Sequence, residues 1–119
     1  MDVSYLKENN IDIDKSLETL GDIETYNEIL NDFYDELEEK LINLENYKNE
    51  SDMENYSILV HALKGECKYL GFNDLADICY NHQLKSEENN TKYINDDFKI
   101  LITEANKIKE IVKKYLESI

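Results

Sequence analysis

The chain has 119 residues, of which 27 are acidic and 13 are lysine or arginine, and its formal charge is −14. This length suits one domain with a single hydrophobic core. The absence of proline, the 3 glycines and the 41% of hydrophobic residues predict long helices and exclude an all-β fold. The negative charge excludes nucleic acids and anionic membrane surfaces as general partners.

The charge is unevenly distributed along the chain. Residues 1–60 hold 17 acidic residues and 4 lysines, a net charge of −13, whereas residues 61–119 hold 10 acidic residues and 9 lysines. No apolar run approaches the roughly 18 residues that span a bilayer, and residues 1–30 hold no basic start followed by an apolar stretch. We therefore expect a soluble, cytoplasmic protein, with Cys67 and Cys79 as reduced thiols.

The first expected helix is short. Ile13, Leu17 and Leu20 share one helical face, and Gly21 stands where a left-handed residue would end the helix. A longer helix follows, with an apolar stripe at spacings of three and four residues: Tyr26, Leu30, Phe33, Leu37, Leu41 and Leu44. The polar segment 46–50 has no apolar period, so we expect it to be a loop.

A third helix is expected to begin at the sequence from Ser51 to Glu54, which has the Ser-x-x-Glu form of a capping box. Its apolar stripe consists of Tyr56, Leu59, Leu63, Cys67 and Leu70. Gly71 is expected to end it, and Asn73 is expected to cap a fourth helix that extends to about Leu84.

The fourth helix has a weaker stripe, made by Leu75, Ile78, Cys79 and His82. After the polar run 86–90, the last helix carries Ile94, Phe98, Leu101, Ala105, Ile108, Val112, Tyr115 and Ile119 at alternating spacings of four and three. Four amphipathic helices with short connections bury their stripes against one another. We therefore predict an all-α, antiparallel four-helix bundle with a short additional N-terminal helix, forming a single monomeric domain over residues 1–119.

One histidine is expected to face water. At 100° per residue, His61 points about 160° away from Leu63, the centre of the buried face of the third helix. Lys64, Gly65 and Lys68 fall on the same outward side, and residues 57–70 have a formal charge of +1. An exposed histidine in a locally basic environment is unusual on so acidic a chain.

Gly65 stands inside the third helix, where glycine costs about 1 kcal/mol relative to alanine. It could leave space for a loop of another protein to reach His61. It could equally allow two helices to pack closely, and the sequence leaves both explanations open.

The chain contains the run His61-Ala62-Leu63-Lys64-Gly65, followed by Leu70-Gly71, Leu75-Ala76, Cys79 and Gln83. This pattern resembles the signature of histidine-containing phosphotransfer (Hpt) domains. An earlier stretch is similar to the usual opening of the family: Ile11 to Leu17, then Gly21, Tyr26 and Leu30. Together these stretches cover most of the chain, and the fold of the family is the bundle inferred above.

The resemblance implies that His61 accepts a phosphoryl group from the aspartyl phosphate of a receiver domain and passes it to another receiver. By family position, Gln83 would accept a hydrogen bond from the second imidazole nitrogen. Lys64 and Lys68 would offset the charge of the phosphoryl group, and Gly65 would keep the surface open. The expected partners are receiver domains of response regulators or a hybrid sensor histidine kinase, which would also hold the Mg²⁺, so that no cofactor is expected in this chain.

Three residues depart from the family pattern. Glu66 and Cys67 stand where serine or alanine is frequent, and the Glu66 carboxylate could slow docking with an acidic receiver. His82 replaces a usual leucine, and we expect it at the edge of the core and not as a second phosphorylation site.

Alternatives to phosphotransfer have less support in the sequence. A zinc site could use Cys79 and His82, which are three residues apart on one face. His61 and Cys67 point in different directions, however, so a metal site is not expected. A non-catalytic bundle that docks on a signalling partner without phosphoryl exchange is the second candidate. No nucleotide-binding loop occurs, so the chain is not expected to be a kinase.

The chain ends and the composition give two further expectations. Met1 and the absence of linker-like ends favour a freestanding protein over a domain of a larger kinase. The richness in Asn, Ile, Lys, Glu and Tyr favours a bacterium with an AT-rich genome.

Overall fold

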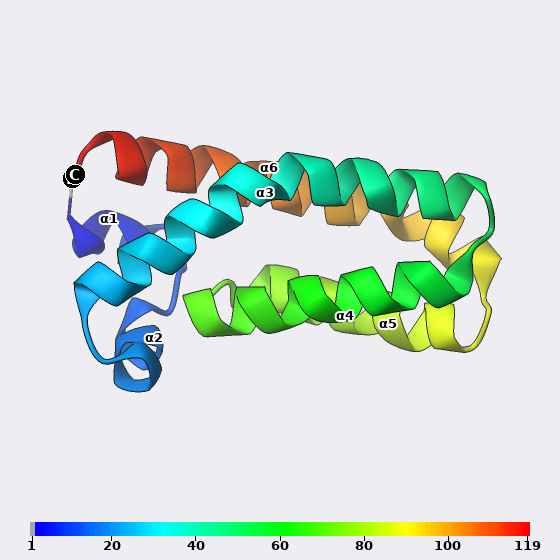
Figure 1. The fold of residues 1–119 in the computed structure, drawn as a ribbon, viewed down its shortest axis with the longest axis horizontal. Coiled ribbons are helices and arrows are strands. Elements are labelled where there is room, and N and C mark those ends of the chain that lie inside the picture. Colours follow the sequence, from blue (N-terminus) through cyan, green and yellow to red (C-terminus); the bar gives the residue numbers. More distant parts are fainter. Residues whose placement is uncertain (1) are drawn as a thin grey trace.

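A computed structural model describes residues 2–119, which form six helices and no strand. The helices are α1 (Val3–Glu8), α2 (Ile13–Leu20), α3 (Ile23–Asn49), α4 (Met53–Leu70), α5 (Asn73–Glu87) and α6 (Thr91–Glu117). Helices α3 to α6 run alternately up and down as a four-helix bundle, and α1 and α2 lie at one end of it (Figure 1). The predicted all-α bundle is confirmed.

The N-terminal region holds two short helices, whereas the sequence predicted one. The predicted helix is α2, and the additional helix is α1. The Asp2 side chain caps α1 by accepting a hydrogen bond from the backbone N–H of Ser4 at 2.8 Å. Helix α1 contacts α2 and α6, and Leu6 is its one fully buried side chain. A six-residue helix with one buried residue has no apolar period to detect.

The predicted helix ends at Gly21 and Gly71 are confirmed. Gly21 ends α2 with a φ angle of 94°, and Gly71 ends α4 with a φ angle of 85°. Gly71 is also constrained by a close backbone approach. A Cβ atom there would lie 2.6 Å from the carbonyl oxygen of Asp12. The Gly71 carbonyl accepts a hydrogen bond from the Asp12 N–H at 3.0 Å. This contact joins the turn between α4 and α5 to the start of α2.

Two predicted helix starts were wrong by one residue. Asp52, and not Ser51, caps α4, because its side chain accepts a hydrogen bond from the Asn55 N–H at 3.1 Å. Ser51 instead has a left-handed backbone, with φ of 55°. Helix α5 begins at Asn73, and its capping position is Phe72, which has no side-chain cap bond.

The predicted loop at residues 46–50 was also wrong, since α3 continues to Asn49. Tyr47 lies in this segment, is partly buried and packs against the core. One aromatic contact therefore extends a helix beyond its apolar stripe.

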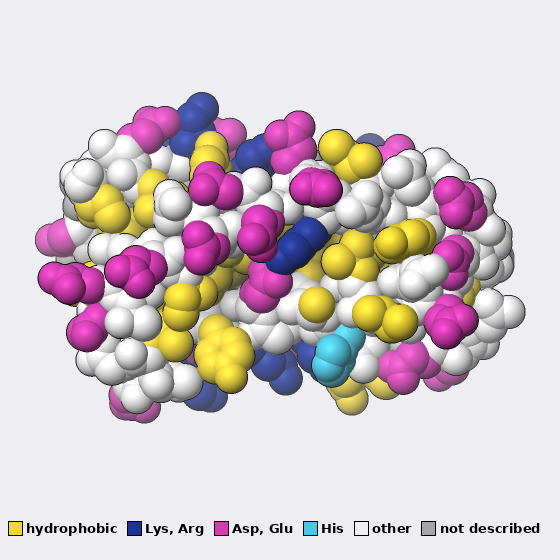
Figure 2. All heavy atoms as spheres, viewed as in Figure 1, with side chains coloured by type: hydrophobic (Ala, Val, Ile, Leu, Met, Phe, Trp, Pro, Cys, Tyr) yellow, Lys and Arg dark blue, Asp and Glu magenta, His cyan; other side chains and the backbone are white. Residues whose placement is uncertain are grey.

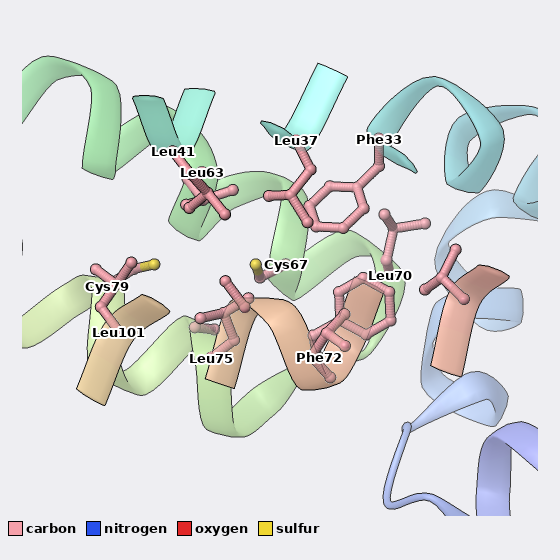
Figure 3. Close-up of a cluster of buried hydrophobic side chains, with 14 of the residues drawn as sticks. Phe33, Leu37, Leu41, Leu63, Cys67, Leu70, Phe72, Leu75, Cys79 and Leu101 are labelled. Carbon is pink, nitrogen blue, oxygen red and sulfur yellow. The ribbon is translucent and has the colours of Figure 1, made fainter. Parts of the chain in front are cut away.

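The four long helices enclose a continuous core (Figure 3). All six predicted stripe residues of α3 are buried, and the Phe33 and Phe72 rings lie 5.2 Å apart across it. Val60 is also fully buried, although it lies outside the predicted stripe. Ile119 was wrongly assigned to the stripe of the last helix, because it follows α6 and is 61% exposed.

The two cysteines are free and buried, and their sulfur atoms point into this core (Figure 3). A hydrogen bond with Cys79, together with burial, raises the pKa of the Cys67 thiol well above its usual value. Both residues therefore serve as small core side chains.

Acidic side chains are spread over the face of the molecule seen in Figure 2, with hydrophobic side chains and fewer lysines between them. None of the helices in residues 2–119 has the length and apolar composition needed to cross a bilayer.

Candidate functional site

His61 lies on the outer face of α4 and is exposed, as the helical geometry predicted. The buried neighbours Val60 and Leu63 face inward and fix the orientation of the helix. The Nδ1 atom of His61 is 3.0 Å from Oε1 of Gln83 on α5. An amide oxygen can only accept, so Nδ1 carries the proton and Nε2 keeps its lone pair.

The Gln83 amide links three other side chains: His61, Lys64 and Glu87. Its Oε1 atom also accepts a hydrogen bond from Lys64 Nζ at 2.8 Å. Its Nε2 atom donates to Oε1 of Glu87 at 2.9 Å. Lys64 Nζ additionally lies 5.1 Å from the ring centroid of Tyr80. The structure thus brings together His61, Lys64 and Gln83, which the sequence singled out, and adds Glu87, which it did not.

The surface beside Gly65 is open. A Cβ atom built at Gly65 would meet no neighbouring atom within 4 Å. The alternative in which this glycine permits close helix packing is therefore wrong. Gly65 lines a hollow of about 510 Å³ with Lys68 and Tyr69 of α4 and Lys15 of α2. Lys68 therefore lines the hollow at Gly65, whereas His61, Gln83 and Glu87 line a different one.

Exposed hydrophobic side chains flank the site. Ile58 and Tyr69 on α4 are 62% and 56% exposed, and Tyr80 and Leu84 on α5 are 47% and 40% exposed. Figure 2 shows an exposed histidine with hydrophobic and lysine side chains beside it. Ile58 lines the hollow at His61, and the Tyr80 ring lies beside Lys64 Nζ, so apolar side chains adjoin the polar site.

Glu66 does not present a free carboxylate to this surface, contrary to the expectation from its position after Gly65. Its Oε1 atom lies 2.5 Å from Nζ of Lys40 on α3. Burial alone would lower the pKa of Lys40, but its bonds to Glu66 and Glu36 outweigh burial and raise it. The charge of Glu66 is therefore offset at the contact between α3 and α4.

His82 lies deeper than the core edge, where the sequence placed it, since it is 0% exposed. Its Nδ1 atom is 2.8 Å from the Tyr56 hydroxyl, and its Nε2 atom is 2.9 Å from Oδ2 of Asp97. A carboxylate accepts, so Nε2 carries the proton and Nδ1 accepts from the hydroxyl. Burial lowers the pKa of His82, and the bond to Asp97 opposes this effect only in part.

These contacts occupy both nitrogens of His82, which leaves neither for the zinc site considered from its spacing with Cys79. Within residues 2–119, no three histidine, cysteine, aspartate or glutamate side chains are grouped so as to hold a metal ion.

Three polar residues of α4 to α6 hold these side chains: Glu87 and Asp97, which the sequence did not single out, and Tyr56, which was predicted only as part of an apolar stripe. Glu87 had a detectable signal, because it lies four residues after Gln83 on the same helix. Tyr56 and Asp97 had no signal of this kind in the sequence, because each lies on a different helix from His82.

Comparison with known proteins identifies one family. Residues 28–109 match the Hpt domain family. This segment begins within α3 and ends within α6, so α1 and α2 lie outside it. No curated protein and no solved structure matches the chain.

Proposed function

This chain belongs to the Hpt domain family, and we propose that it carries a phosphoryl group on His61 between receiver-domain aspartates. An Hpt domain implies phosphotransfer within a phosphorelay, with receiver domains as partners. The observation that supports His61 is its exposed ring, whose Nδ1 is held by Gln83 while Nε2 keeps a free lone pair.

In the proposed reaction, the Nε2 lone pair attacks the phosphorus of the receiver's aspartyl phosphate. The N–P bond forms as the P–O bond to the aspartate breaks, and the aspartate leaves as a carboxylate. The Nδ1 proton stays on the ring and continues to donate to Gln83. Such a transfer depends on alignment and charge stabilisation more than on covalent help from the protein.

Each of the other proposed site residues has a separate role. Gln83 holds the ring in one tautomer, and Lys64, 2.8 Å from the same amide oxygen, is close enough to turn toward the phosphoryl oxygens. Gly65 leaves room for the partner, and Lys68 adds positive charge in the neighbouring hollow. Lys68 is exposed and Lys64 is half-buried, and both lysines are expected to contribute modestly and to be sensitive to salt.

The proposed partners are receiver domains of response regulators or of a hybrid sensor histidine kinase. The exposed hydrophobic side chains around His61 support a docking surface there: Ile58, Tyr69, Tyr80 and Leu84. The Mg²⁺ of the reaction would belong to the receiver.

We further propose a monomeric, cytoplasmic carrier of bacterial origin, with residues 1–119 as one domain. The packing of α1 and α2 on the bundle supports the single domain. The composition, rich in Asn, Ile, Lys, Glu and Tyr, supports the bacterial origin.

The test is incubation of the full chain with several phosphorylated receivers, with label on this chain as the readout. We expect label that survives alkali but not acid, as a phosphorus–nitrogen bond to histidine does, and no label on His61→Gln. Circular dichroism would check that this variant is folded. Failure of every receiver to label the wild type, or equal labelling of His61→Gln, would contradict the proposal.

The alternative of a non-catalytic docking bundle depended on Glu66 and Cys67. Glu66 is paired with Lys40, and Cys67 is buried in the core, so neither disrupts the surface at His61. No observation now favours this alternative, and in the same experiment it would appear as receiver binding without transfer of label.

A further inference from the structure

We infer that Glu87 is a positioning residue, which fixes the end of the Gln83 amide that faces His61 and thereby selects the tautomer of the imidazole. The consequence for transfer depends on the proposed function, whereas the effect on the tautomer does not. Glu87 lies one helical turn after Gln83 on α5, and both side chains line the hollow at His61.

The amide of Gln83 sits between a positive and a negative group. Its oxygen accepts from Lys64 Nζ at 2.8 Å and from His61 Nδ1 at 3.0 Å. Its nitrogen donates to the Glu87 carboxylate at 2.9 Å. The amide oxygen therefore faces two hydrogen-bond donors, and the amide nitrogen faces an acceptor.

Rotation of this amide by 180° would reverse each of these matches. The NH₂ group would face the Lys64 ammonium, and the carbonyl oxygen would face the Glu87 carboxylate. The NH₂ group would also meet Nδ1 of His61, which could then only accept. The proton would move to Nε2, and the nitrogen that faces the partner would lose its lone pair.

Glu87 matters most when Lys64 is engaged elsewhere. The ammonium of Lys64 is the mobile charge that the proposed function assigns to the incoming phosphoryl group. Once it leaves Gln83, Glu87 is the remaining charged group among residues 2–119 with a hydrogen bond that distinguishes the two ends of the amide. If Glu87 acted only by repelling the phosphoryl group, its removal would speed transfer. If Glu87 orients the Gln83 amide, its removal should slow transfer.

The test measures the tautomer of His61 by ¹⁵N NMR of the unphosphorylated full chain at about pH 8, where an ordinary imidazole is neutral. Lys64→Met serves as the background, because it leaves Glu87 as the charged group that orients the amide. We expect Lys64→Met to keep the proton on Nδ1. In Lys64→Met/Glu87→Leu, the ratio of Nδ1–H to Nε2–H should fall about fivefold, as expected for the loss of one hydrogen bond.

Two further variants separate the causes. Lys64→Met/Glu87→Gln keeps a side chain of the same size, but its amide can either accept from the Gln83 NH₂ group or donate to the Gln83 oxygen, so it should not restore the ratio. Lys64→Met/Glu88→Leu removes a neighbouring carboxylate, which lies 3.7 Å from Lys85, and should leave the ratio unchanged. The His82 signal, with its proton on Nε2, provides an internal reference in each spectrum.

An unchanged tautomer ratio in Lys64→Met/Glu87→Leu would overturn the inference, whatever its transfer rate. The single variant Glu87→Leu should also transfer label more slowly than Glu88→Leu. A faster rate would mean that repulsion by the carboxylate dominates, and this too would overturn the positioning role. Absence of label on the wild type would instead count against the proposed function alone.

Discussion

The two histidines of this chain have opposite environments, although the helices that carry them are packed together. His61 on α4 is exposed, donates from Nδ1 to one amide oxygen and keeps Nε2 free. His82 on α5 is fully buried and has both nitrogens engaged, by Tyr56 and Asp97. Residue type alone therefore does not make a phosphoryl acceptor, because the acceptor must also have one nitrogen without a partner.

The contrast also explains how α5 is held. Residues 82 and 83 are consecutive and project about 100° apart, so His82 points into the core while Gln83 points to the surface. The bonds of His82 connect α5 to Tyr56 on α4 and to Asp97 on α6. The buried histidine thus stabilises the helix that presents Gln83 to the exposed one.

The largest expected effect is a loss of unfolding free energy in His82→Leu, which removes the partner of the buried Tyr56 hydroxyl. An unsatisfied buried group of this kind costs about 1–3 kcal/mol of unfolding free energy. Urea unfolding would measure the loss. Transfer of label should remain within about twofold under native conditions, in contrast to His61→Gln.

The matched control is Tyr56→Phe/His82→Leu, which also removes the hydroxyl. Because replacement of both partners by apolar groups can be nearly neutral, this double variant should be more stable than His82→Leu alone. Equal stability of His82→Leu and the wild type would mean that the buried bonds contribute nothing.

A second, smaller effect is expected at Gly65, where the open surface beside His61 can be closed. Gly65→Phe should slow transfer about tenfold by obstructing the partner, which corresponds to about 1.4 kcal/mol of barrier. Gly65→Ala should keep transfer and raise the unfolding free energy by up to about 1 kcal/mol, because alanine is the better helix former. Transfer rates and urea unfolding would test both, and a loss of stability without slower transfer would contradict this view.

The smallest change in unfolding free energy is expected from a change of pH, and we assign it to the buried histidine. Burial lowers the pKa of His82 in the folded state, so the unfolded chain binds this proton more readily. The unfolding free energy should therefore be highest above about pH 6.5 and fall as the pH decreases below it. The side chains that face His82 are Tyr56 from α4 and Tyr93 and Asp97 from α6.

Urea unfolding at pH 7.5 and pH 5.5 would measure this dependence. His61→Gln should retain the decrease in stability on acidification, whereas Tyr56→Phe/His82→Leu should show a smaller decrease. An equal decrease in both variants would assign the pH dependence to other groups.

Much of the fold could be predicted because helical periodicity is a local property. The apolar stripe of α3, the glycine ends at Gly21 and Gly71, and the outward direction of His61 follow from spacing along one helix. The short helix α1, the cap at Asp52 and the extension of α3 to Asn49 could not be predicted in this way. Each depends on one or two contacts, which leave no repeating pattern.

The sequence by itself determined the helical bundle, the exposed histidine with its lysine and glycine, and the resemblance that led to the Hpt family. Only the tertiary structure decided that Glu66 is neutralised by Lys40, that His82 is enclosed, and that Glu87 holds the amide of Gln83. The physical reason is that a helical period fixes the direction of a side chain. The partner that a side chain contacts depends on how the neighbouring helices pack and on which rotamers their side chains adopt.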